Sequence, residues 1–359
     1  MSWENKVRKT IPYTAGEQPK NKNIIKLNTN ECPYPPAPGV KKAISELGLR
    51  SDDLRLYPDM NATALVDALA EFYKISSDKI FVGVGSDDVL ALCFLTFFTN
   101  GDPILFPAVT YSFYPVWADL YGISYKQIPL THDMGIDEYE YMPALTGAAN
   151  GGIIFPNPNA PTGVEEPLSR IEKIVKANPD SVVIVDEAYI DFGGTSALPL
   201  IEKYDNLLIV QTFSKSRSMA GLRIGFAMGN EKLIGYLKDI KFSFNSYTMN
   251  LPSIMLGKAA VEDREYFEAT TGKIVNTRER FKKELSDMGF VFPDSKANFV
   301  FAMHPAFSGD YLFAELRKRN IVVRHWNSPA IREYLRITIG TDGQMEAVAA
   351  ALREITAAQ

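Results

Sequence analysis

The chain carries, at residues 207–227, the stretch LLIVQTFSKSRSMAGLRIGFA. Its first four residues, Leu207–Val210, predict a buried strand, and a turn rich in hydroxyl side chains follows directly, with Lys215 near its centre. Residues 222–227 are again largely apolar and predict the next strand. A buried strand that runs into a polar turn is typical of an α/β protein, in which chemistry lies at strand ends.

Short apolar runs of the same kind precede this segment and alternate with helical stretches. Leu65, Ala68, Leu69 and Phe72 share one face of a predicted helix, Thr63–Tyr73. Several of the runs are continuously apolar, as expected of strands that are covered on both faces in a largely parallel sheet. The predicted strands lie at residues 80–84, 104–106, 153–155 and 182–185.

Beyond about residue 245 the pattern changes to α+β. A long predicted helical stretch precedes three predicted strands, and a helix at Tyr311–Arg319 separates the first two of them; the helical stretch spans residues 252–289 and the strands 298–303, 321–324 and 335–339. A chain of 359 residues exceeds one average core, so we expect two domains. They are a large α/β domain with a mostly parallel central sheet flanked by helices, at residues 46–245, and a smaller α+β domain at residues 1–45 and 246–359.

Composition argues against several classes of protein. The net charge is only -5, and no Lys/Arg run provides the basic surface that nucleic acid or a membrane surface attracts. Cys32 and Cys93 are the only cysteines of the sequence, so we expect neither a disulfide framework nor a metal site of paired thiols. The polar start, Met1–Thr10, is unlike a signal peptide, and no apolar segment approaches the ~18 residues of a membrane span. We therefore expect a cytoplasmic protein.

The turn around Lys215 carries the strongest chemical signal. A lysine at a strand end can act as an amine nucleophile. The hydroxyls of Thr212 and Ser214, with the planar donor fork of Arg223, can hold a phosphate. A solvated Ser-rich loop is the alternative interpretation of this turn.

Asp186 and Tyr189 follow the apolar run at residues 182–185. An aspartate at that point is either a helix cap or a buried carboxylate that keeps a pyridine nitrogen protonated, which makes the ring an electron sink. Tyr189 can donate to the phenolic oxygen of such a ring, or it is an ordinary surface or core tyrosine.

Two more turns follow predicted strands. Residues 157–163 form a rigid turn rich in Asn and Pro, which needs no function as such. The turn Gly83–Asp88 leads into a helix whose first N–H groups can bind a phosphate, although a plain N-cap is the commoner use of such a turn. All four signals lie at strand ends of one α/β domain. Together they match the requirements of a pyridoxal phosphate site.

Eight short segments, spread over nearly the whole chain, form a recognisable set of motifs: Leu27–Glu31, Arg55–Pro58, Gly85–Asp88, Asn157–Gly163, Asp186–Tyr189, Ser214–Lys215, Ala220–Arg223 and Leu335–Gly340. On these segments the chain resembles the fold-type-I pyridoxal-phosphate aminotransferases, and among them the histidinol-phosphate aminotransferase family. The lysine and aspartate motifs are highly specific to the superfamily.

The resemblance implies a role for each matched residue. Lys215 is the Schiff-base lysine and the proton carrier. Asp186 pairs with the pyridine nitrogen of the cofactor and Tyr189 with its phenolic oxygen, while Tyr111 stacks on the ring face. The residues that surround the phosphate of the cofactor are Ser86, Asp87, Thr212, Ser214 and Arg223.

The resemblance extends to the substrate and to a second subunit. Tyr57 matches a tyrosine that reaches the phosphate of the neighbouring subunit, which implies a homodimer with shared sites. Arg324 and Arg336 match arginines that bind substrate anions; strand-end surface arginines are the alternative. Tyr13 and Asn30 close the substrate site from the N-terminal arm, although Tyr13 also fits a simple anchor of the terminus.

The chain departs from the family at Ala160. The family has an Asn immediately before Pro-Thr-Gly, and the amide of that Asn meets the phenolic oxygen of the cofactor. Here Asn159 or Asn157 takes over the contact, or Tyr189 holds the oxygen with help from water. We assign Asn159 to the cofactor site.

These residues predict transamination between histidinol phosphate and 2-oxoglutarate in histidine biosynthesis, with ping-pong kinetics. Two arginines suit a phosphate on one substrate and a carboxylate on the other. An aromatic or other amino acid aminotransferase and a threonine-phosphate decarboxylase are the alternatives within the superfamily. A non-catalytic binding protein has no need of an intact Lys215, and a nicotinamide dehydrogenase requires a third fingerprint glycine where Asp88 stands.

Overall fold

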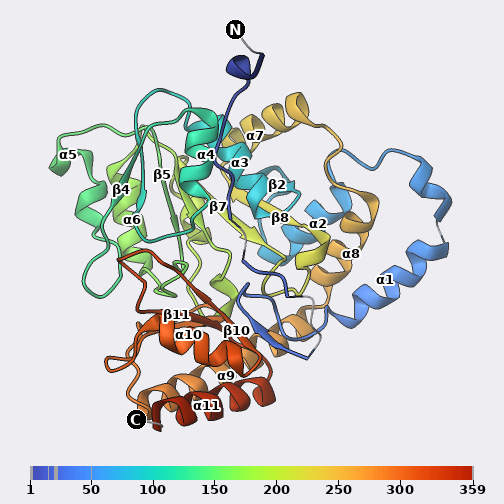
Figure 1. The fold of residues 1–359 in the computed structure, drawn as a ribbon. Coiled ribbons are helices and arrows are strands. Elements are labelled where there is room, and N and C mark those ends of the chain that lie inside the picture. Colours follow the sequence, from blue (N-terminus) through green and yellow to red (C-terminus); the bar gives the residue numbers. More distant parts are fainter. Residues whose placement is uncertain (1–2, 15, 20–22, 50, 358–359) are drawn as a thin grey trace.

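The structure is a computed structural model that describes residues 3–14, 16–19, 23–49 and 51–357. In the described residues, seven strands form the larger of two sheets: β2 (Ile80–Gly83), β3 (Ile104–Pro107), β4 (Tyr125–Ile128), β5 (Ile153–Pro156), β6 (Val183–Asp186), β7 (Leu207–Thr212) and β8 (Gly225–Gly229). Their order is β2-β8-β7-β6-β5-β3-β4 (Figure 1). Only β8 runs against its neighbours among these strands, so the mostly parallel sheet expected from the sequence is confirmed.

Helices cover both faces of this sheet. Side chains on one face, such as Val185 and Ile209, pack against α1 (Pro38–Leu49), α2 (Thr63–Tyr73), α6 (Leu168–Ala177) and α8 (Leu251–Glu262). Side chains on the opposite face, such as Ile184 and Leu208, pack against α3 (Ser86–Phe97), α4 (Tyr114–Tyr121) and α7 (Glu231–Phe244). Burial on both faces stabilises the sheet by about 1.5–3 kcal/mol for each large aliphatic side chain. It also explains why β5, β6 and β7 are continuously apolar.

The smaller sheet has its own core. Its strands in the described residues are β1 (Ile25–Leu27), β9 (Phe299–Ala302), β10 (Ile321–His325) and β11 (Leu335–Thr338), in the order β1-β10-β11-β9. Figure 1 shows α9 (Arg264–Asp287), α10 (Gly309–Lys318) and α11 (Asp342–Ala357) gathered at this end of the molecule. The N-terminal β1 pairs in parallel with β10, so segments about 300 residues apart in the sequence form one sheet.

Several boundaries differ from the sequence predictions. The helix Thr63–Tyr73 is confirmed. The predicted helical stretch 252–289 is wrong as a single helix, because it breaks at Asp263, whose side chain caps α9 by accepting from the N–H of Tyr266. The strand predicted at 222–227 begins only at Gly225, because Arg223 has a left-handed φ of 51°.

Short elements complete the fold. The strands β1 and β4 were not predicted, since three or four residues with polar members give too little pattern. Short helical turns in the described residues are α5 (Pro143–Thr146) and the 3-10 turns Trp3–Lys6, Ser51–Arg55, Ser77–Lys79, Glu138–Tyr141, Ile190–Phe192, Leu198–Glu202 and Ala220–Leu222. None of the helices in the described ranges has the length and apolar character needed to cross a bilayer.

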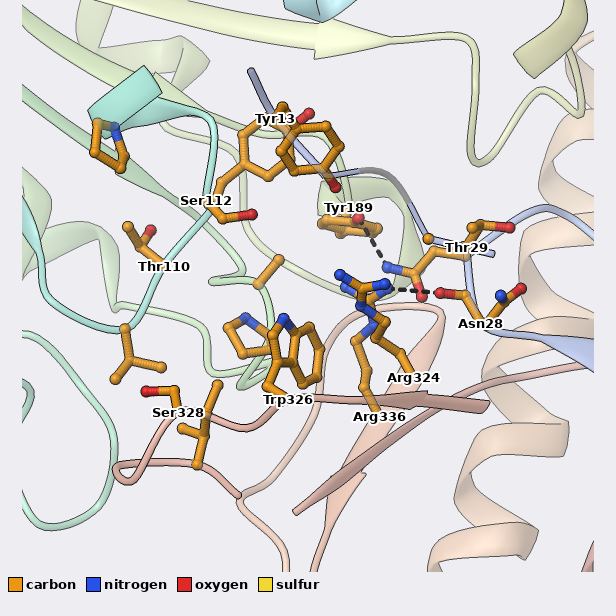
Figure 2. A pocket seen from close by; sticks show the side chains of 18 of the residues that line it. Tyr13, Asn28, Thr29, Thr110, Ser112, Tyr189, Arg324, Trp326, Ser328 and Arg336 are labelled. Atoms are coloured by element: carbon orange, nitrogen blue, oxygen red, sulfur yellow. Dashed lines mark hydrogen bonds between the residues drawn. The ribbon is translucent and has the colours of Figure 1, made fainter. Parts of the chain in front are cut away.

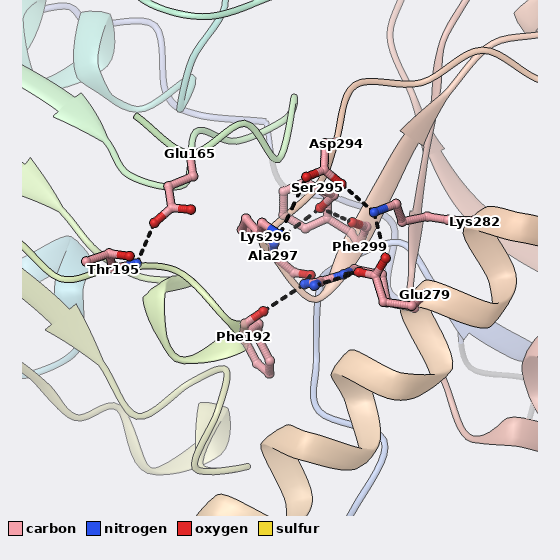
Figure 3. Close-up of polar contacts among 11 residues, drawn as sticks. Glu165, Phe192, Thr195, Glu279, Lys282, Asp294, Ser295, Lys296, Ala297 and Phe299 are labelled. Carbon is pink, nitrogen blue, oxygen red and sulfur yellow. Dashed lines mark hydrogen bonds and ion pairs between the residues drawn. The ribbon is translucent and has the colours of Figure 1, made fainter. Parts of the chain in front are cut away.

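Polar contacts join the two halves of the molecule. The side chain of Arg278, buried on α9, donates to the carbonyl of Phe192 (2.8 Å), which lies after β6, and to that of Ala297 (2.9 Å), which precedes β9. Figure 3 shows this junction, with Lys282 beside it between Glu279 and Asp294. Buried charge-assisted bonds of this kind fix where the smaller sheet stands relative to the larger one.

Candidate functional site

Two adjoining cavities lie at the carboxyl ends of the parallel strands. A cavity of about 180 Å³ extends over the ends of β6 and β7, and a cavity of about 340 Å³ extends toward the smaller sheet. The residues that line both are Thr29, Tyr111, Ala160, Tyr189 and Lys215. We call the first the inner cavity and the second the outer cavity.

The structure brings most of the predicted site residues to these cavities. The inner cavity is lined by Ser86, Asp87, Tyr111, Asp186, Tyr189, Thr212, Ser214, Lys215 and Arg223. The outer cavity adds Tyr13, Asn30, Arg324 and Arg336. Two predicted residues, Tyr57 and Asn159, are not among the residues that line either cavity.

Lys215 lies at the boundary between the cavities. Its ammonium group donates to the carbonyl oxygen of Thr29 (3.2 Å) and lies 5.7 Å from the centre of the Tyr189 ring. An ammonium group has three N–H donors, so one hydrogen bond to a backbone oxygen leaves two donors for a ligand. The amine is therefore placed to meet a group in the inner cavity and a ligand in the outer cavity.

Asp186 forms the deep end of the inner cavity. Its side chain is 4% exposed and accepts hydrogen bonds from the Tyr114 hydroxyl (3.0 Å) and the N–H of Ala188 (3.2 Å). Burial raises the pKa of Asp186 to about 6, and these hydrogen bonds limit the rise. A buried carboxylate with only two donors is suited to a cationic or N–H partner from a ligand.

The opposite end of the inner cavity is rich in donors. Arg223 contacts the Asp87 carboxylate (3.1 Å) and the Ser214 hydroxyl (3.4 Å). Ser86 begins α3, where backbone N–H groups favour an anion. Gly85 has a φ of 89°, and a Cβ built there would lie 2.5 Å from the Arg223 guanidinium. Only a glycine lets this arginine lie so close to the start of the helix.

Tyr111 stands between these two ends. Its hydroxyl donates to Asp87 (2.8 Å), and its ring meets that of Tyr114 edge to face at 5.7 Å. Burial raises the pKa of Tyr111, and the Asp87 carboxylate raises it further. The hydrogen bond fixes the ring beside the inner cavity, where its face is available to a planar ligand.

Arg324 and Arg336 carry the positive charge of the outer cavity. They stand opposite each other on β10 and β11, and each guanidinium lies 5.3 Å from the ring of Trp326 (Figure 2). Arg336 donates to the carbonyl oxygen of Asn28 (3.0 Å), and burial lowers its pKa, as does the charge of Arg324. No ion pair joins either arginine to a carboxylate of the described chain. Two like charges in register cost stability, which a bound anion would relieve.

The N-terminal segment contributes two residues to the outer cavity. Tyr13 stacks on Phe113 with ring centres 4.2 Å apart. Asn30 is fully buried and donates to the Tyr189 hydroxyl (2.9 Å). Tyr57, by contrast, is 82% exposed and packs on Tyr247 away from the cavities of its own chain.

At position 160 the chain presents a methyl group to both cavities. The amide of Asn159 is occupied: its N–H groups go to the Val109 carbonyl and the Thr162 hydroxyl (both 3.0 Å), and its oxygen accepts from Thr110. Asn157 is fully buried, and its side-chain oxygen accepts from the N–H of Glu166. Neither amide lines the inner cavity.

Sequence reasoning missed Tyr114 and Trp326. Trp326 had a signal, because it lies two residues after Arg324 and therefore on the same side of an extended chain. Tyr114 had none, because it stands 72 residues from its partner Asp186 and only the packing of α4 on the sheet brings them together.

The donor set of the inner cavity fits pyridoxal phosphate. It is lined by a buried carboxylate, by an arginine with hydroxyls beside a helix start, and by the amine of Lys215. These groups match the pyridine nitrogen, the phosphate and the aldehyde of that cofactor.

Comparisons with known proteins agree with this chemistry. The sequence profile of "Aminotransferase class I and II" matches residues 22–352. A histidinol-phosphate aminotransferase of Lactococcus lactis subsp. cremoris (strain MG1363) is 50% identical over 354 residues, which cover 99% of this chain and 98% of that protein. Histidinol-phosphate aminotransferase 2 of Dechloromonas aromatica (strain RCB) is 51% identical, with 99% of each chain covered. The crystal structure of histidinol-phosphate aminotransferase from Sinorhizobium meliloti in complex with pyridoxal-5'-phosphate is 25% identical, with a TM-score of 0.84, over 93% of this chain and 91% of that one.

Proposed function

Because the chain belongs to the class I and II aminotransferase family, we propose that it is a pyridoxal-phosphate-dependent histidinol-phosphate aminotransferase. The family match confirms the resemblance drawn from the sequence motifs. One observation carries the assignment of the site: Lys215 lines the inner cavity together with a buried carboxylate and a phosphate-type donor set, and it also lines the outer cavity, which holds an arginine pair.

Each end of the inner cavity has a task in this proposal. Pyridoxal phosphate supplies an aldehyde that condenses with amines and a protonated ring that accepts the electron pair left by the α-proton. Asp186 would hold the proton of the ring nitrogen, and Arg223 with the Ser214 hydroxyl would hold the phosphate. Lys215 Nζ, once displaced by the amino donor, would take the proton from the α-carbon of the substrate. It would then deliver this proton to the cofactor carbon that carried the aldehyde.

The outer cavity would select the substrates. Histidinol phosphate carries a phosphate, and 2-oxoglutarate carries two carboxylates, so both partners of the ping-pong cycle bring an anion to the same place. Arg324 and Arg336 would bind that anion in turn, which explains why two adjacent cations stand in register on β10 and β11. The names of relatives about 50% identical over nearly the whole chain support histidinol phosphate as the amino donor.

Spectroscopy with competing donors tests the function. The purified protein with pyridoxal phosphate is expected to be yellow, and histidinol phosphate should bleach it more efficiently than phenylalanine or threonine phosphate. Product analysis separates the alternatives, since transamination yields a ketone and decarboxylation releases carbon dioxide. Carbon dioxide release from threonine phosphate, or preferred bleaching by phenylalanine, would overturn the substrate assignment.

Arg336→Gln is expected to raise the KM for both substrates by about 10–100-fold, the size expected when one charge-assisted pair of 1.5–3 kcal/mol is lost. The expected effect on cofactor binding is small, because Arg336 lines only the outer cavity. Steady-state kinetics with each substrate, alongside a cofactor titration, measure the two effects. Arg332→Gln, an exposed arginine near the same sheet, serves as the control. An unchanged KM for both substrates would remove Arg336 from the anion site.

We also propose a homodimer with shared sites. Tyr57 is exposed and lies outside both cavities of its own chain, in a region with further exposed apolar side chains, Leu54 and Leu56. Exposed apolar residues in a cluster are typical of an interaction surface. In the dimer, Tyr57 would reach the cofactor phosphate of the partner. Sedimentation of the holoprotein as a monomer would contradict this proposal.

The proposed domain division follows the two cores. Residues 46–245 would form the large cofactor-binding domain, and residues 1–45 with 246–359 would form the N-terminal arm and the small domain. Separate buried clusters around the two sheets support it, although α8 and the part of α1 before residue 46 pack with the core of the larger sheet. A cytoplasmic location is proposed from the resemblance to biosynthetic enzymes.

A further inference from the structure

We infer that Asn30 is a positioning residue that turns the Tyr189 hydroxyl proton into the inner cavity, so that Tyr189 donates to the phenolic oxygen of the cofactor without help from residue 160. This inference rests on the proposed function. It assigns to a buried residue of the N-terminal segment a role in the chemistry of a site built mainly on the larger sheet.

The hydrogen bonds of Asn30 fix its amide. Its backbone N–H donates to the Thr338 hydroxyl (3.1 Å), which in turn donates to the side-chain oxygen of Asn30 (2.9 Å). Asn298 donates to the backbone oxygen of Asn30 (3.0 Å). With the amide reversed, its nitrogen would face the Thr338 hydroxyl, and the Thr338 proton would lose the acceptor that it has here. The orientation that satisfies both groups therefore points the amide nitrogen at Tyr189.

The hydroxyl of Tyr189 is thereby an acceptor toward Asn30, at 2.9 Å. A phenol has one proton, and an oxygen that receives a hydrogen bond on one side keeps that proton for another partner. The ring itself is held by an edge-to-face contact with Phe299, at 5.1 Å between ring centres. Since Tyr189 lines both cavities, its proton is directed toward the ligand and away from the protein.

Residues 159 and 160 offer no equivalent donor to the inner cavity. Ala160 presents a methyl group, and both amide N–H groups of Asn159 are bonded to the protein. The left-handed backbone of Asn30, with a φ of 56°, suits Asn and Gly better than most residues. The amide of Asn30 and the hydroxyl of Tyr189 thus form a two-step relay from Thr338 on β11 to the cofactor.

A pH titration of the visible absorption of the holoprotein tests the relay. A hydrogen bond to the phenolic oxygen of the cofactor withdraws negative charge from that oxygen. The proton on the neighbouring nitrogen, which would join the cofactor to Lys215, is then held less tightly, so its pKa is lower. Asn30→Gly fits the backbone and removes the amide; it is expected to raise the pH midpoint of the absorption change by about one unit. Asn30→Asp keeps the shape and offers Tyr189 only acceptors, and it is expected to raise the midpoint at least as far.

Two comparisons separate positioning from a structural effect. In the Tyr189→Phe background the neutral variant Asn30→Gly should not move the midpoint further, because the relay has lost its last member. Asn320→Gly changes an exposed asparagine that has a similar left-handed φ of 58° and lines neither cavity, so it should leave the midpoint unchanged. If Asn30→Gly does not fold, Asn30→Ser, which is also neutral, carries the test.

The outcomes distinguish this inference from the proposed function. A protein that develops no visible band with pyridoxal phosphate refutes the proposed function itself. A normal band with an unshifted midpoint in the Asn30 variants overturns only the role of Asn30. An equal shift by Asn30→Gly in the Tyr189→Phe background, or any comparable shift by Asn320→Gly, overturns it as well.

Discussion

Replacing Lys215 by Ala is expected to abolish transamination, with a loss of about 10³-fold or more, because one amine both links to the cofactor and moves the α-proton. Folding should be retained, since the ammonium group has one hydrogen bond to the Thr29 carbonyl and lies at the edge of two cavities. Lys215→Arg keeps the positive charge but has no amine that can condense with an aldehyde, so it should be equally inactive.

Borohydride reduction followed by peptide mapping identifies the lysine that is covalently linked to the cofactor. The wild-type protein should carry its pyridoxyl label on Lys215, and both variants should carry none. Lys258→Ala, a part-exposed lysine paired with Glu262, is the matched control and should keep both label and activity. A label on another lysine, or full turnover by Lys215→Ala, would refute the proposed mechanism.

Asp186→Asn should lower turnover by about 10²–10³-fold, the usual effect of removing one buried electrostatic partner of the reacting group. Asn can still accept from the Tyr114 hydroxyl, so the local packing is kept while the negative charge is lost. A neutral amide stabilises a protonated ring nitrogen much less than a carboxylate does. Turnover at saturating substrate and cofactor measures the effect, and wild-type turnover would exclude Asp186 from the site.

The same variant should stabilise the cofactor-free protein at high pH. Folding raises the pKa of Asp186 from 3.8 to about 6, so ionising the buried carboxylate costs stability. The cost is absent below about pH 4, grows between about pH 4 and about pH 6, and is constant at higher pH. It then amounts to about 3 kcal/mol, since one pKa unit corresponds to about 1.4 kcal/mol. Asp186→Asn removes most of this cost.

Thermal unfolding of the cofactor-free protein at pH 5 and pH 8 measures the difference. The unfolding midpoint of Asp186→Asn should exceed that of the wild type at pH 8, and by less at pH 5. Asp180→Asn, at an exposed position, should show no such dependence. If Asp186→Asn were less stable than the wild type at pH 8, the ionised carboxylate would not destabilise the cofactor-free protein.

The strands that carry the cofactor chemistry could be predicted because burial on both faces leaves a continuous apolar run. The observed bounds of β5, β6 and β7 differ from the predicted bounds by at most two residues. Polar residues at the ends of β6 and β7 or just after them line the inner cavity. The start of β8 could not be predicted, because the left-handed turn at Arg223 has no signature in an Ile-Gly-Phe context. The break at Asp263 is likewise local capping inside a stretch with helical periodicity on both sides.

The amino-acid sequence by itself determined the sheet, the Lys215 and Asp186 motifs and the family, because these depend on short runs in which neighbours in sequence are neighbours in space. Tertiary structure alone decided which side chains meet across the molecule. Asn30 reaches Tyr189 across 159 residues, and Arg336 reaches the carbonyl of Asn28 across 308. Such contacts form only when β1 joins β10 and the smaller sheet is fixed against the larger one. Their geometry is set by packing between elements, which no local pattern records.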